Sequence, residues 1–79
     1  MSYCRFSDAD VYLYRSSRGV ECSWCPLHPG ITILTFERYS DAIAHLDEHV
    51  AAGHDVPDYA FDGLRSDMAA EGDLVKEMP

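Results

Sequence analysis

The chain has 79 residues, of which 47% are hydrophobic, and a formal net charge of −8. This hydrophobic content excludes a disordered acidic polymer, and no apolar run approaches the roughly 20 residues that a membrane-spanning helix needs. Residues 1–6 lack the basic and then apolar pattern of a secretory signal. We therefore expect a small cytoplasmic domain without a membrane segment.

The charge is unevenly distributed along the chain. Residues 1–36 are balanced, whereas residues 37–79 carry eleven acidic and three basic residues, and with them the whole net charge. An acidic surface repels nucleic acid, so the distribution favours a protein partner. An acidic mimic of nucleic acid that binds a basic protein is an alternative interpretation.

The first half of the chain is typical of β-structure. Residues 11–14 contain β-forming side chains, residues 16–19 indicate a turn, and residues 20–24 pair back to form a β-hairpin. Residues 31–36 are β-branched and apolar, which makes them a candidate third strand.

A first helix is predicted over residues 41–52. Ser40 is a suitable N-cap, and Gly53 is a suitable stop. The apolar residues Ile43, Leu46 and Val50 recur at helical spacing, so this stripe is expected to face the core.

A second helix is predicted over residues 57–70. Pro57 suits its first position, and Phe61, Leu64 and Met68 form its apolar stripe. Residues 1–70 then make one α+β domain, a β-hairpin with a candidate third strand plus two helices. Residues 71–79 are expected to be an acidic flexible tail.

Four residues have the types and spacing of a metal site. Cys22 and Cys25 are separated by two residues, and His45 and His49 are four apart, so they share one face of the predicted helix. Two thiolates and two imidazoles complete a tetrahedral shell with no open position, which is typical of structural zinc. We expect one structural Zn²⁺, with the histidines flanking the apolar stripe.

Other candidate donors are given different roles. Three cysteines are an odd number, which argues against a disulfide framework, and Cys4 is expected to be a buried small hydrophobe. His28 is an alternative ligand because it follows Cys25 closely, whereas His54 is expected to be exposed. Trp24 is expected to pack over the zinc knuckle.

The metal pattern over residues 11–49 resembles the Cys2His2 zinc-finger family. Cys22-x2-Cys25 and His45-x3-His49 match its ligand pairs, and a hairpin before a helix matches its order of elements. Nineteen residues separate the two pairs here, where the family usually has about twelve. The resemblance implies structural zinc and leaves a nucleic-acid-binding finger, with Arg38 at a base-reading position, as an alternative function.

Residues 1–6 and 45–59 are also similar to small proteins encoded by actinobacterial bacteriophages, a group without an assigned activity. This resemblance implies that the protein acts inside a bacterial host. With the charge distribution, it favours a phage protein that binds a host protein.

Two enzymatic interpretations compete with this one. Residues 45–49 spell H-x-x-E-H, the inverted zinc-protease motif, in which Glu48 would be the general base. However, a catalytic zinc needs an open position, and Cys22 and Cys25 would close it. The Cys-x2-Cys pair also fits a redox dithiol, but it lies outside the βαβ setting that such motifs favour. We therefore expect a protein that is not an enzyme, and its oligomeric state remains open.

Overall fold

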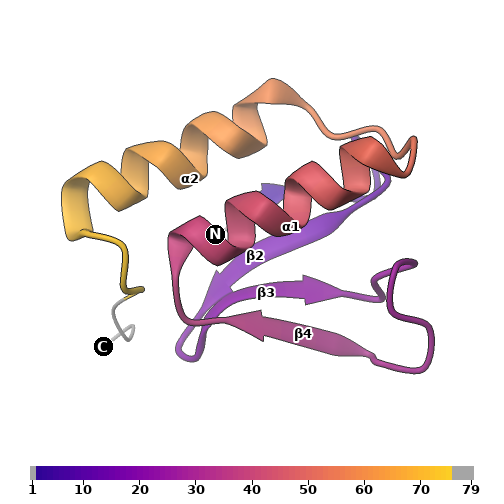
Figure 1. The fold of residues 1–79 in the computed structure, drawn as a ribbon, viewed down its shortest axis with the longest axis horizontal. Coiled ribbons are helices and arrows are strands. Elements are labelled where there is room, and N and C mark those ends of the chain that lie inside the picture. The colour runs from indigo at the N-terminus through magenta and orange to yellow at the C-terminus, as the bar shows by residue number, and fades with distance from the viewer. Residues whose placement is uncertain (1, 76–79) are drawn as a thin grey trace.

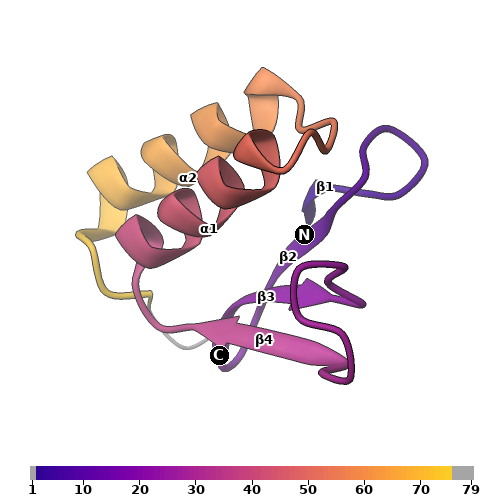
Figure 2. The ribbon, with the colours of Figure 1, turned by 45° about the vertical axis from the view of Figure 1, so that its right-hand side comes forward.

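A four-stranded antiparallel sheet with two helices on one face forms the domain, in a computed structural model that describes residues 2–75 (Figures 1 and 2). The sheet order follows the sequence order. The α+β class is confirmed, and no helix in the described part is long and apolar enough to cross a membrane. The elements are β1 (Ser2–Cys4), β2 (Tyr12–Ser16), β3 (Gly19–Ser23), β4 (Ile33–Phe36), α1 (Tyr39–Ala51) and α2 (Asp58–Glu71).

The predicted hairpin and third strand are confirmed as β2, β3 and β4. Strands β2 and β3 pair from Tyr12↔Ser23 to Ser16↔Gly19, so residues 17 and 18 make a two-residue turn. Gly19 has φ +138°, and a Cβ there would lie 2.3 Å from the carbonyl oxygen of Phe36, so the backbone of β4 approaches too closely for a side chain. Strand β1 was not predicted, because three residues are too few to show a periodic pattern.

The core lies between the sheet and the helices. Leu13 and Val20 face it from neighbouring strands, and Leu46 and Leu64 face it from α1 and α2; all four are fully buried. Burial of each such side chain contributes about 1.5–3 kcal/mol. This core holds α1 against the inner face of the sheet and so sets the distance between the histidines and β3.

The buried face of α1 differs from the predicted stripe. Leu46 is buried as expected, but Val50 is 51% exposed and Ile43 is only half-buried. The buried set is instead Tyr39, Ala42, His45, Leu46 and His49. The prediction was wrong because it placed the histidines beside the core, whereas they lie on the buried face of α1.

The start of α1 is also held differently from the prediction. Ser40 is not the N-cap: the helix begins at Tyr39, and its N-cap residue, Arg38, makes no side-chain capping bond. Instead, the Asp73 carboxylate accepts hydrogen bonds from the Ser40 N–H at 2.8 Å and from its hydroxyl at 2.9 Å. A carboxylate near the first turn is favourable because unpaired N–H groups and the positive helix end lie there.

The predicted tail, residues 71–79, lies partly outside the described residues. Within the described part, Glu71 is the last residue of α2, and Val75 donates its N–H to the Glu37 carbonyl at 2.8 Å. Contacts of the domain therefore extend beyond residue 70, to Val75.

Candidate metal centre

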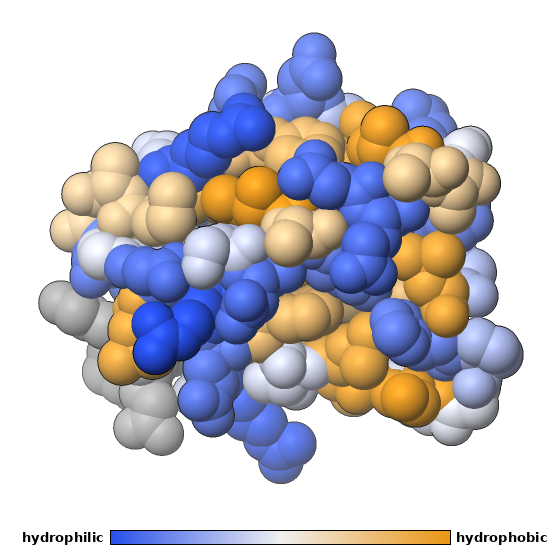
Figure 3. Space-filling model, in the orientation of Figure 1, coloured by the Kyte–Doolittle hydropathy of each residue, from blue (hydrophilic) through white to orange (hydrophobic). Residues whose placement is uncertain are grey.

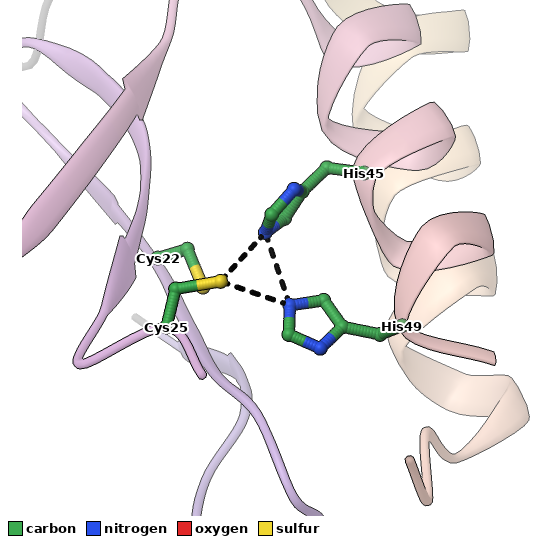
Figure 4. A group of neighbouring side chains, drawn as sticks. All are labelled: Cys22, Cys25, His45 and His49. Atoms are coloured by element: carbon green, nitrogen blue, oxygen red, sulfur yellow. Dashed lines mark hydrogen bonds between the residues drawn. The ribbon is translucent and has the colours of Figure 1, made fainter. Parts of the chain in front are cut away.

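The structure brings the four predicted ligands together (Figure 4). Cys22 lies in β3, Cys25 lies in the following loop, and His45 and His49 project from α1 toward both sulfurs. All four side chains are buried, and one ligand atom from each lies within 4.8 Å of the others. The group can therefore hold a metal ion.

The separations among three of the ligand atoms, those of Cys25, His45 and His49, are close to those in a tetrahedral zinc site. Cys25 Sγ lies 3.5 Å from His45 Nε2 and 3.3 Å from His49 Nε2, and the two Nε2 atoms are 3.0 Å apart. Zinc bond lengths with tetrahedral angles give about 3.5 Å for S···N and about 3.3 Å for N···N. Each of these three atoms lies close to the other two, and hydrogen bonds among them cannot pair all three contacts at once, because each neutral imidazole has only one N–H. A cation at their centre would accept one lone pair from each of the three atoms.

The backbone around the knuckle explains how the two sulfurs converge. Cys22 is opposite Leu34 in the β3–β4 register and opposite Leu13 in the β2–β3 register, which puts its side chain on the inner face of the sheet. Trp24 then adopts φ +54°, in the left-handed region, and its N–H bonds the Thr32 carbonyl at 2.7 Å. This turn brings Cys25 back toward α1.

Trp24 does not pack over the site, contrary to the prediction. Its side chain is 69% exposed. The side chain that covers His45 is instead Phe36 of β4, with ring centroids 4.9 Å apart. The left-handed backbone at residue 24 turns the tryptophan outward while it directs the chain inward.

Burial sets the protonation of the imidazoles. It lowers the pKa of His49 from 6.5 to about 4, with further lowering by the charges of His45, His54 and His28. The pKa of His45 is also lowered, mainly by burial. Both rings are therefore neutral at pH 7, which is the form that coordinates a metal.

Burial acts in the opposite sense on a thiol. It raises the pKa of Cys22 well above its usual range, and the neighbouring Cys25 raises it further. A redox dithiol requires a lowered thiol pKa, so this environment disfavours redox chemistry. A bound cation would supply the positive charge that stabilises a buried thiolate.

The other candidate donors also have defined places. His54 was expected to be exposed, but it is half-buried, and its Nδ1 lies 2.8 Å from His49 Nδ1. His28 is not part of the four-residue group. It stacks on His45 at 5.8 Å between ring centroids and forms a second possible group of ligands with His45 and Glu48. Cys4 is buried, as predicted.

The His49–His54 contact could not be predicted from the sequence, because the direction of a side chain past the end of a helix is not fixed by residue spacing.

Comparison of the chain with family models, with curated proteins and with solved structures gives no match. The site therefore rests on the geometry and chemistry of its own residues.

Proposed function

We propose that this protein is a small module that folds around one structural zinc ion held by Cys22, Cys25, His45 and His49. The observation that supports it is the convergence of four buried donors from β3, its loop and α1. Two sulfurs and two nitrogens in tetrahedral array favour Zn²⁺ among common metals. Because the ligands come from both layers, the metal's binding free energy contributes to folding.

We also propose that the role of the module is binding rather than catalysis. Four protein ligands leave no position for water or substrate on the ion. Glu48, the base of the alternative protease interpretation, is exposed on the surface of α1. The proposed partner is a host protein in the cytoplasm of a phage-infected bacterium. That assignment is supported by the charge of the second half and by the resemblance to phage proteins.

A protein partner is favoured over DNA by the surroundings of Arg38. This residue would read a base if the helix acted as a finger, but its guanidinium lies 3.6 Å from the Asp73 carboxylate. The exposed face of the same helix carries Asp41, Asp47 and Glu48. Phosphates would be repelled there, and phosphate contacts supply most non-specific affinity for DNA.

Metal content tests the proposal. Protein purified without chelator or metal-binding tag should contain one zinc per chain, and Cys22→Ser and His49→Ala should each lose both the zinc and the folded state. Cys4→Ala is the matched control, since it removes a buried thiol outside the site and should keep the metal. A wild-type chain that keeps its circular dichroism and melting temperature after complete metal removal would contradict a structural ion.

A further inference from the structure

Strand β4 forms one edge of the sheet. It is the last strand in the order, and Figure 1 places it at the margin of the sheet, whereas the opposite edge strand, β1, lies against α2. The Trp24 N–H bonds the Thr32 carbonyl next to the Ser23↔Ile33 pair, which fixes the alternation of the ladder. The N–H and C=O groups of Ile33 and Thr35 therefore point away from β3.

This edge has no charged residue or proline to block strand addition. Residues Ile33–Phe36 contain no charge and no proline, and Ile33 is 45% exposed. The same edge already accepts a pairing partner further along. Val75 donates to the Glu37 carbonyl and Tyr39 donates to the Asp73 carbonyl, both at 2.8 Å, around the Arg38↔Leu74 bridge. Among residues 2–75, no backbone hydrogen bond joins the outward groups of Ile33 and Thr35.

A groove of about 690 Å³ runs beside this edge, between β4 and α1. Leu34 and Phe36 contribute apolar walls, and Glu37, Asp41 and Glu48 contribute carboxylates. The single cation among its lining residues is Arg38, which Asp73 already neutralises in part. Figure 3 shows this face, on which hydrophilic and hydrophobic residues are interspersed over α1 and β4. As far as residues 2–75 show, the groove thus combines a strand edge without a backbone partner at Ile33 and Thr35 with a negative wall.

We propose that a basic, extended segment of a partner protein adds to β4 as a further strand and fills this groove. This inference rests on the proposed role as a protein-binding module and specifies the partner's chemistry. Strand addition gives affinity through main-chain hydrogen bonds, and alternate side chains give specificity. A second copy of this chain is disfavoured as the occupant, because it would bring its own Glu37, Asp41 and Glu48 against the same carboxylates.

The distance between the acidic residues of the groove predicts the sequence pattern of the partner segment. Asp41 and Glu48 are seven residues apart on α1, about 10.5 Å along the helix axis. Side chains on one face of a strand recur about every 6.4–6.8 Å, so two or three alternate Lys or Arg residues span that distance. The intervening side chains lie on the opposite face of the sheet beside exposed Ile33 and Thr35, where apolar residues fit. An alternating Lys-Val sequence therefore represents the expected partner.

The test is a titration of a capped seven-residue Lys-Val peptide into the zinc-loaded, ¹⁵N-labelled full chain. We expect shift changes and slower amide exchange at Ile33 and Thr35, and no binding by the equivalent Glu-Val peptide. Thr35→Pro removes one outward N–H and should weaken binding about tenfold, as expected for one lost hydrogen bond. Thr35→Ser should match wild type, since it keeps that N–H and the hydroxyl that donates to the Glu21 carboxylate.

Charge and backbone contributions are separable. Asp41→Asn with Glu48→Gln should weaken binding about fivefold at low salt, whereas Asp58→Asn with Asp62→Asn, outside the groove, should not.

N-methylated peptides test the backbone contribution. In an antiparallel strand the valine N–H groups face β4, and in a parallel strand the lysine N–H groups do, so methylation of the valine or the lysine nitrogens blocks one orientation only. One of the two methylated peptides should fail to bind while the other retains binding.

Several results would overturn the proposal: equal binding by both methylated peptides, shifts confined to α1, or self-association through β4 without peptide binding. Zinc content measured on the same sample keeps the outcomes separate. Peptide binding can fail in a chain that holds its zinc, which would reject the strand addition and leave the metal module standing.

Discussion

His49 and His54 contact each other through their Nδ1 atoms, 2.8 Å apart. For the Nε2 atom of His49, which points to Cys25 and His45, to offer its lone pair to a metal, the His49 Nδ1–H must donate this hydrogen bond and His54 Nδ1 must accept it. Outer hydrogen bonds of this kind hold a metal-binding ring in position. His54 is therefore a positioning residue of the candidate site, although it is not one of the four ligands.

Replacement of His54 by alanine should weaken zinc binding without abolishing it. The expected loss is about tenfold in affinity, at the lower end of the range for outer partners of metal-bound histidines. Competition with a chromogenic chelator measures it. His54→Asn, whose side-chain oxygen can accept a hydrogen bond from Nδ1, should recover part of the loss, and Asp62→Asn, at an exposed position of α2, serves as the control. Unchanged affinity in His54→Ala would show that the contact has no role.

Acid should release the metal and destabilise the fold. Folding lowers the pKa of His49 from 6.5 to about 4, so between these pH values the unfolded chain binds more protons than the folded one. Stability is then full above pH 6.5 and falls as the pH drops toward 4. Bound zinc acts in the same direction because coordination requires neutral imidazole. Melting temperatures of the zinc-loaded chain at pH 7.5, 6 and 5 should decrease in that order, and equal values would contradict the protonation argument.

The pair of Arg15 and Glu71 should contribute to stability. Arg15 donates two hydrogen bonds of 2.7 Å to the Glu71 carboxylate, which also accepts one from the Tyr39 hydroxyl at 3.1 Å. The pair joins β2, α1 and the end of α2, and both side chains are largely buried. Glu71→Ala should lower the free energy of unfolding by about 2 kcal/mol, because it removes two hydrogen bonds from the Arg15 guanidinium and one from the Tyr39 hydroxyl.

The matched control for this pair is Asp62→Ala, which removes the exposed ion pair between Asp62 and Arg65, 3.9 Å apart. Exposed pairs contribute about 0–1 kcal/mol, so this variant should unfold close to wild type in urea. Similar losses in Glu71→Ala and Asp62→Ala would show that burial does not strengthen the interaction.

Gly19→Ala should be strongly destabilising. The added Cβ would lie 2.3 Å from the Phe36 carbonyl oxygen, and the residue has φ +138°. Backbone strain and forced movement of β4 together cost about 3 kcal/mol. Gly30→Ala isolates the backbone effect, since Gly30 has φ +92° but nothing within 4 Å of its Cβ. Urea denaturation should show the larger loss for Gly19→Ala, and equal losses would reject the close approach.

Local sequence patterns are enough to predict the class of the fold and the four candidate ligands. A turn followed by β-branched residues predicts the hairpin and β4, because these signals depend on local conformational preference. The spacing of Cys22 and Cys25, and of His45 and His49, brings each pair together through the geometry of a turn and of a helix. Strand preference and ligand spacing both depend on residues close in the sequence, so they can be predicted without the tertiary structure.

The buried face of α1 and the side chains around the ligands depend on tertiary packing. Val50 lies outside the core and His49 inside it, because α1 is rotated to direct its histidines at β3. The contact of His54 with His49 and the outward turn of Trp24 depend on backbone angles in loops. Such contacts between distant or irregular segments arise from the packing of the whole chain, which residue spacing does not encode.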